Sequence, residues 1–256
     1  MRLRPADDGE AVRALIAAVR FLTRVPVPGP DTRVQDLPPA VAWYPLVGAA
    51  VGAAIGGIFI ALSLGLPPWV AAVLAVAAGL LLTGGFHEDG ATDATDGLGG
   101  GFTTEKVLLI MKDSRIGAYG AMALWVVLSL RVACLVALGA AAVPAMMLAM
   151  AWGRWTAAPL TRLPALGEGL AKEITAQIPR WVPWLSTALA LGATLLAYHL
   201  GQPCAAWGGC AAVAAASLWG CYLWHRLGGQ SGDLLGAGNQ LAEGAVLIVL
   251  LWGTTA

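Results

Sequence analysis

The chain has 256 residues, of which 58% are hydrophobic and only 12% are charged, and its net charge is zero. Soluble domains average about 25% charged residues, so this composition excludes an ordinary soluble domain. The absence of a basic excess argues against a nucleic-acid partner. We therefore expect an all-α protein, a polytopic helical bundle whose partner is the lipid bilayer.

The first predicted element is an amphipathic helix over Glu10–Arg24. Its apolar stripe is Val12, Leu15, Ile16, Val19 and Leu22, and its basic side is Arg13, Arg20 and Arg24. This pattern is typical of a helix that lies on an anionic membrane leaflet. Pro26 and Pro28 end the helix.

Seven apolar segments predict about seven transmembrane helices, at 42–66, 68–85, 118–138, 139–153, 181–200, 204–224 and 241–255. Every acidic residue, and every basic residue except Arg131, lies in one of four segments, 1–36, 86–117, 154–180 and 225–243. The positive-inside rule places these segments in the cytoplasm. We expect a single domain over 1–256, multi-pass in the cytoplasmic (inner) membrane, with its active site facing the cytoplasm.

Two features lie within or beside the spans. Arg131 falls inside the third span, where it would either snorkel to the far interface or pair with a polar group in the bundle. The cluster Trp152–Trp155 predicts an aromatic anchor at the membrane interface.

The second span is followed by the most informative feature, three carboxylates with helical spacing. Asp89, Asp93 and Asp96 stand at i, i+4 and i+7, which places them within roughly 60° on one helix face. Such a cluster is costly unless a cation holds it together, and oxygen ligands favour Mg²⁺ or Mn²⁺. The alternative is a solvated acidic turn. Gly90 within this helix indicates the close approach of a ligand or another backbone, and glycines 97–101 predict a mobile loop.

Further polar residues precede the third span. Asp113 is a candidate fourth metal ligand, and Lys112 and Arg115, with Ser114 between them, are candidates to hold phosphate oxygens. The alternative is that both cations are ordinary positive flanks of a span. His87 is a candidate to orient a carboxylate, act as a base or contact a phosphate, or else is structural.

The last charged segment leads into the final span with a second polar stretch. Its candidate substrate-binding or supporting residues are Ser231, Asp233, Gln240 and Glu243. Helix capping and loop roles are the alternative for these residues. Metal ions and cations at a membrane surface suit phosphoryl transfer.

Three stretches closely resemble the cobalamin synthase family, that is, adenosylcobinamide-GDP ribazoletransferases. They are Thr83–Gly97, Ile110–Gly117 and Gly228–Ala237. Phe21–Pro28 and Tyr44–Gly48 are also similar to the N-terminal region of that family. The chain departs from the pattern at Glu88, where an apolar residue is usual and which we expect to be exposed, and at Gln240, where Glu is common.

The resemblance implies a Mg²⁺-dependent enzyme that joins adenosylcobinamide-GDP to α-ribazole or its 5′-phosphate and releases GMP. It implies that Asp89, Asp93, Asp96 and Asp113 hold metal, and that Asp93 or Asp96 takes the hydroxyl proton. A homo-oligomer, or association with other cobamide-assembly enzymes, is compatible with it. The alternatives are a lipid enzyme of the CDP-alcohol phosphotransferase type and a Mg²⁺ or proton transporter.

Overall fold

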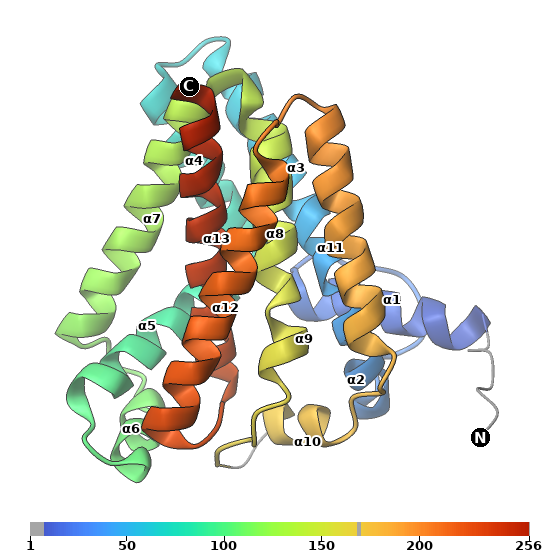
Figure 1. The fold of residues 1–256 in the computed structure, drawn as a ribbon, viewed down its shortest axis with the longest axis vertical. Helices are drawn as coiled ribbons and strands as arrows, with labels where there is room; N and C mark the ends of the chain where they lie inside the picture. Colours follow the sequence, from blue (N-terminus) through green and yellow to red (C-terminus); the bar gives the residue numbers. More distant parts are fainter. Residues whose placement is uncertain (1–7, 168–169, 256) are drawn as a thin grey trace.

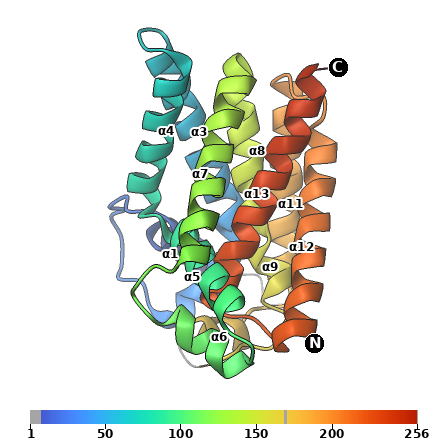
Figure 2. The same cartoon turned by 90° about the vertical axis from the view of Figure 1, so that its left-hand side faces the viewer.

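The computed structural model describes residues 8–167 and 170–255, and the described chain is helical almost throughout (Figures 1 and 2). The helices are α1 Asp8–Leu22, η1 Val34–Asp36, α2 Leu37–Ala40, η2 Val41–Trp43, α3 Tyr44–Ser63, α4 Pro68–Thr83, α5 Phe86–Gly100, α6 Thr104–Met111, α7 Ala118–Leu138, η3 Gly139–Ala141, α8 Ala142–Trp155, α9 Ala157–Leu160, α10 Leu170–Ala176, α11 Val182–His199, α12 Ala205–Leu227 and α13 Gly232–Thr255. The all-α prediction is confirmed.

Each predicted span contains a helix, but the predicted count of seven spans is not confirmed. In the described chain, four helical segments are long and apolar enough to cross a membrane, namely Val34–Ser63, Ala118–Leu160, Ala205–Leu227 and Gly232–Gly253. The bent pair of α4 and α5 makes a fifth when it is counted as one span. Helices α4 and α8 have only 16 and 14 residues, fewer than the ~20 that a bilayer requires.

The centre of the bundle is the contact between α3 and α8. Gly48, Gly52 and Gly56 follow one face of α3, and a Cβ atom at any of them would collide with the backbone of α8. Small residues at this spacing let two helices approach closely, which is how membrane helices pack without a hydrophobic driving force. The contact places Arg154, at the end of α8, inside the bundle.

The N-terminal helix α1 forms as predicted, and Leu22 of the predicted stripe is buried, but the rest of the buried face differs from that stripe. The buried side chains include Ala14, Ala17 and Ala18, whereas Val12 is 57% exposed. The guanidinium of Arg20 binds the chain itself, since it donates to the carbonyl oxygens of Val27 and Pro30 at 2.7 and 2.6 Å. These bonds hold the proline-rich loop against α1.

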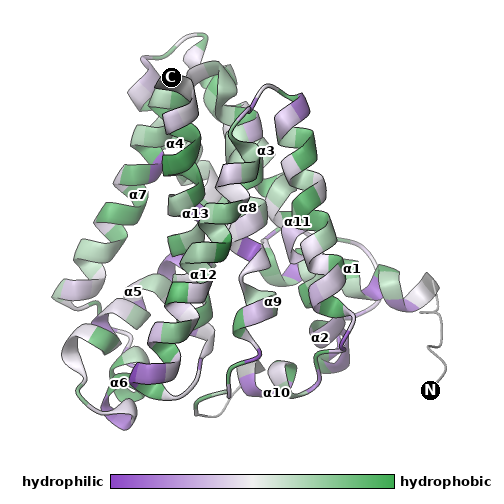
Figure 3. Cartoon of the chain, viewed as in Figure 1, coloured by the Kyte–Doolittle hydropathy of each residue, from purple (hydrophilic) through white to green (hydrophobic). Residues whose placement is uncertain are grey.

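Hydrophilic residues gather at the end of the bundle that carries α6 and α10 (Figure 3). Helix α5 lies near this end and bends by 91° from the axis of α4. It therefore turns away from the direction of the spans, and with 15 residues it is too short to be a span by itself. The predicted glycine loop is wrong, since α5 continues through Gly100.

Candidate active site

The change of direction before the aspartates depends on two glycines. Gly84 and Gly85 have φ angles of +73° and +67°, which lie in the left-handed region that favours glycine. A Cβ atom at Gly84 would collide with the guanidinium of Arg24. The backbone N–H of Arg24 donates to the Leu82 carbonyl at 2.7 Å. The segment after α1 is therefore hydrogen-bonded to the end of α4, next to the turn that starts α5.

Helix α5 then crosses α13 at small residues. A Cβ atom at Gly90 would lie 3.2 Å from the Cα of Asp233 and 3.5 Å from that of Gly236. Of the two explanations for Gly90, the close approach of another backbone is the one found here. The crossing brings Asp233, at the start of α13, to the aspartates of α5.

Asp89 and Asp93 line a cleft of about 770 Å³. Its polar side also includes Arg24 and Ser114, and its apolar wall is formed by Leu80, Leu81, Leu124 and Leu128 of helices α4 and α7. The cleft therefore has carboxylates and a cation on one side and an apolar surface of leucine side chains on the other. This combination suits an amphipathic substrate.

The carboxylates in this cleft influence one another. Partial burial, followed by the negative charges of Asp89, Asp233 and Asp96, raises the pKa of Asp93 to about 6. Like charges at close range disfavour a second ionised group. A cation or a proton therefore stabilises the cluster, and Asp93 is the group that takes up the proton most readily.

Asp96, on the same helix, is used differently. Its two carboxylate oxygens accept hydrogen bonds from the backbone N–H groups of Gly117 and Gly120, at 2.7 and 2.8 Å. These amides belong to the first turn of α7, which has no intrahelical acceptors for them. Asp96 thus fixes the start of α7 against α5.

The segment before α7 is exposed and pairs within itself. Arg115 donates to both carboxylate oxygens of Asp113, at 3.0 and 2.6 Å. These hydrogen bonds lower the pKa of Asp113 to about 2. Ser114 lines the cleft, and Lys112 is exposed at the end of α6. Asp113 therefore pairs with Arg115, and it is not among the described residues that line the cleft with Asp89 and Asp93.

The residues of the last polar stretch separate into three places. Asp233 joins the aspartate cluster. Ser231 lies just before α13, where its hydroxyl oxygen accepts from the Leu234 N–H at 3.5 Å, a capping contact. Gln240 and Glu243 lie deeper in the bundle and are 5% and 1% exposed.

Gln240 and Glu243 belong to a buried charge network that joins four helices. Arg131 of α7 forms ion pairs with Glu88 of α5 and Glu243 of α13 at 2.8 and 2.7 Å, and Arg154 of α8 pairs with Glu243 at 2.9 Å. Gln240 accepts from Arg131 at 2.8 Å and donates to Glu88 at 3.3 Å. With two cations and two anions, the network is neutral as a whole. Of the two alternatives for Arg131, pairing inside the bundle is confirmed.

Two members of this network were assigned wrongly from the sequence. Glu88 is 5% exposed, although exposure was expected, and the predicted aromatic anchor at Trp152–Trp155 is turned inward, since Trp152 and Arg154 are each 3% exposed. The signal in the sequence that identifies Glu88, and its fellow acid Glu243, is charge balance within the apolar segments. A predicted span with one buried cation requires buried anions, and Glu88 and Glu243 are the acids nearest in sequence to apolar segments.

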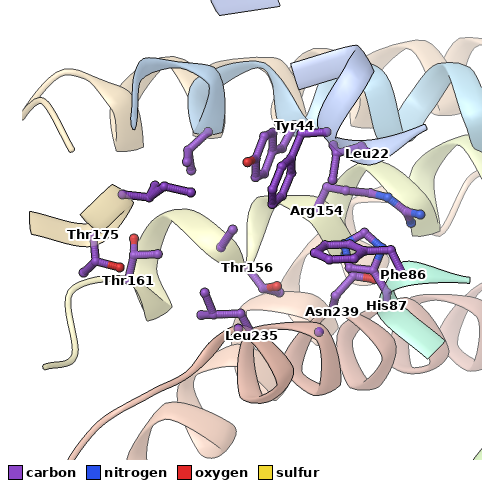
Figure 4. Close-up of a pocket in the computed structure, with 16 residues that line it drawn as sticks. Leu22, Tyr44, Phe86, His87, Arg154, Thr156, Thr161, Thr175, Leu235 and Asn239 are labelled. Atoms are coloured by element: carbon purple, nitrogen blue, oxygen red, sulfur yellow. The ribbon is translucent and has the colours of Figure 1, made fainter. Parts of the chain in front are cut away.

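His87 lies apart from the cleft and lines a second cavity, of about 240 Å³, between α1, α8, α9 and α13 (Figure 4). Burial, followed by the charge of Arg154, lowers the pKa of the His87 imidazole to about 3. The ring is therefore neutral at physiological pH, and a neutral imidazole has one N–H donor and one acceptor.

Comparison with known proteins places this geometry in a family. Residues 14–251 match the family model described as cobalamin-5-phosphate synthase. Relatives named adenosylcobinamide-GDP ribazoletransferase include those of Ralstonia nicotianae (43% identical, 96% of this chain and 97% of the relative), Leptothrix cholodnii (40%, 94% and 96%) and Thiobacillus denitrificans (37%, 93% and 94%). No solved structure matches the chain. The chain therefore belongs to the cobalamin-5-phosphate synthase family, whose members are membrane-bound transferases of cobalamin biosynthesis.

Proposed function

We propose that the aspartate cleft joins adenosylcobinamide-GDP to α-ribazole, or to its 5′-phosphate, and releases GMP. The observation that carries the proposal is that Asp89 and Asp93 line a cleft with an apolar wall, while Asp233 is close enough for its charge to act on both. The corrinoid is large and partly apolar, so it would lie along the leucines of α4 and α7. Its pyrophosphate would then reach the polar side of the cleft.

We further propose that the cleft takes Mg²⁺, with Mn²⁺ as an alternative. In the described residues, no three His, Cys, Asp or Glu side chains are grouped closely enough to hold an ion by themselves. Mg²⁺ is usually bound by one or two carboxylates together with substrate phosphates and water. The oxygen donors of Asp89 and Asp93, and the mutual repulsion in their cluster, fit this mode. The ion would neutralise the negative charge that develops on the phosphates.

The chain's own residues supply the remaining functions. A ribose hydroxyl attacks the phosphorus on the cobinamide side, a new P–O bond forms, and the P–O bond to GMP breaks. Asp93, whose pKa is raised to about 6, is suited to accept the hydroxyl proton. Arg24 and Ser114, which line the cleft, would contact phosphate oxygens, and Lys112 would add positive charge from the exposed end of α6. We assign Asp96 and Asp113 to structural positions instead of the metal.

The orientation in the membrane follows from charge. Hydrophilic residues gather at the end of the bundle that carries α6 and α10 (Figure 3). The segments around these two helices contain Lys106, Lys112, Arg162 and Lys172. The positive-inside rule therefore favours a cleft that opens to the cytoplasm. The enzyme would then meet soluble α-ribazole directly. The family match favours this transferase over a lipid phosphotransferase or a transporter, and oligomeric assembly is not required by the site.

The test is turnover by the purified protein in liposomes. With adenosylcobinamide-GDP, α-ribazole and Mg²⁺ present, we expect equal amounts of GMP and a cobalamin product, measured by chromatography. Chelation of Mg²⁺ by EDTA should stop the reaction. Asp93→Asn should lower kcat by at least ~100-fold, the usual contribution of a general base. Asp31→Asn, a matched change in an exposed loop, should have no effect. Equal activity of the two variants would reject the assignment of Asp93.

A further inference from the structure

The cavity beside His87 is the strongest feature that the aspartate cleft leaves unexplained. Its volume of about 240 Å³ lies just below the ~300–1,000 Å³ of typical ligand pockets. It therefore suits a fragment of one or two rings and is far too small for a corrinoid. Its walls come from α1, α3, α5, α8, α9 and α13, so residues far apart in the sequence build it together (Figure 4).

One wall of the cavity is aromatic. The rings of Phe21 and Tyr44 are stacked, with centroids 5.9 Å apart and an interplanar angle of 6°. Phe86 meets Phe21 edge to face at 5.2 Å, and His87 meets Phe86 in the same way at 5.1 Å. A planar aromatic ligand gains both apolar burial and quadrupole complementarity against such a wall.

The cavity also has a small number of polar groups. His87, Asn239 and the cation Arg154 line it and are 7%, 2% and 3% exposed. His87 Nδ1 and Asn239 Oδ1 are buried and have no hydrogen-bond partner among the described residues. Buried polar groups without partners are costly, and their presence in a binding cavity indicates that a ligand completes them.

The position of the cavity relates it to the aspartate cleft. Gly232 on its rim directly precedes Asp233, and His87 lies two residues before Asp89. Among the described residues, the cavity and the cleft have no lining residue in common, so Asp233, whose charge acts on Asp89 and Asp93, is the link between them. A nucleoside whose base enters the cavity beside Gly232 would place its sugar toward Asp233.

We propose that this cavity binds the base of the acceptor nucleoside, a planar bicyclic heterocycle with one free ring nitrogen. The proposal rests on the proposed function, in which the ribose of that nucleoside supplies the attacking hydroxyl. The free ring nitrogen accepts a hydrogen bond from the His87 imidazole, whose buried Nδ1 has no partner among the described residues, and the Oδ1 of Asn239 is left to accept from a hydroxyl of the attached sugar. Aromatic contacts with Tyr44 and its neighbours supply the remaining affinity.

The same chemistry argues against the guanine of the second substrate. Guanine has donors and acceptors around its whole edge, and the walls of this cavity are mainly apolar. A benzimidazole base has only one such atom to satisfy.

The experiment fills the cavity with Ala157→Leu, a residue of α9 that lines it. We expect the KM for α-ribazole to rise by ~10-fold or more, as steric exclusion from an apolar pocket predicts, while the KM for adenosylcobinamide-GDP stays within twofold of wild type. Ala77→Leu, the same change at an exposed position of α4, should leave both values unchanged. Leu235→Phe fills the cavity from α13 and replaces Ala157→Leu if that variant does not fold.

A binding measurement separates this inference from the proposed function. Equilibrium dialysis of α-ribazole against the protein in nanodiscs should show binding to wild type and Ala77→Leu and loss of binding in Ala157→Leu. This result supports the cavity even if no product forms, in which case the proposed reaction alone is rejected. An increase confined to the KM for adenosylcobinamide-GDP, or no change in either KM or in binding, would overturn the assignment of the cavity.

Discussion

Replacing Arg131 tests the buried charge network most directly, because this side chain connects both acids. Arg131 pairs with Glu88 at 2.8 Å and with Glu243 at 2.7 Å, and it donates to Gln240 at 2.8 Å. In Arg131→Met, Glu243 keeps Arg154 at 2.9 Å, but Glu88 keeps only the amide of Gln240. One carboxylate then stays buried without a cation.

The expected cost is large compared with the stability of an ordinary protein. Removing one partner of a buried ion pair costs ~3–5 kcal/mol, whereas total free energies of unfolding are ~5–15 kcal/mol. Replacing a complete buried pair with neutral groups is close to neutral. The double variant Glu88→Gln/Arg131→Met leaves only the balanced pair of Glu243 and Arg154. It should therefore recover most of the stability that Arg131→Met loses.

The assay is denaturation in mixed detergent micelles, followed by circular dichroism, for wild type, both single variants and the double variant. Arg180→Met serves as the control, since Arg180 is exposed, and its unfolding midpoint should equal that of wild type. A double variant that is less stable than Arg131→Met would refute the charge-balance argument. It would indicate that the side chains contribute through packing instead of through their charges.

Two further predictions concern the aspartates. Asp93 has a raised pKa of about 6, so it is protonated below that pH and ionised above it, and Mg²⁺ binds only the ionised form. The Mg²⁺ concentration that gives half-maximal GMP release should therefore rise by about tenfold per unit as the pH falls below 6, and a constant value would contradict this. Asp96→Ala should lower the free energy of unfolding by on the order of 3 kcal/mol, because two backbone N–H groups lose an ionised acceptor, and Asp96→Asn should lose less. Loss of activity at unchanged stability in Asp96→Ala would instead support a role for Asp96 as a metal ligand.

The sequence predicts local structure well here and long-range contacts poorly. The helices and the shared face of Asp89 and Asp93 follow from spacing along one segment. The destination of Asp96 does not, because its partners Gly117 and Gly120 belong to another helix and donate from the backbone. Every residue except proline has a backbone N–H group, so the sequence cannot show which N–H groups bind a carboxylate. Asp96 therefore differs in its contacts from Asp89 and Asp93, although the three share one spacing.

The contacts of the buried acids and arginines are likewise long-range and are not predicted by local sequence. The local sequence around Glu88 does not reveal which helix covers this side chain. Only the arrangement of α7 and α13 around α5 places Arg131 against it. Charge balance within apolar segments would have identified the partners, since an isolated charge there is expensive.

The order of the charged residues along the chain has a consequence for biogenesis. Domains form from the N-terminus during synthesis, and Glu88 is made before Arg131, so the first pair is complete when α7 enters the bilayer. Arg154 has no such partner at that time, because Glu243 lies in the last helix. Until α13 leaves the ribosome, the cation of α8 must stay hydrated or near lipid headgroups. Translation of the final helix therefore completes the buried charge network, and the same helix brings Asp233 to the aspartates of α5.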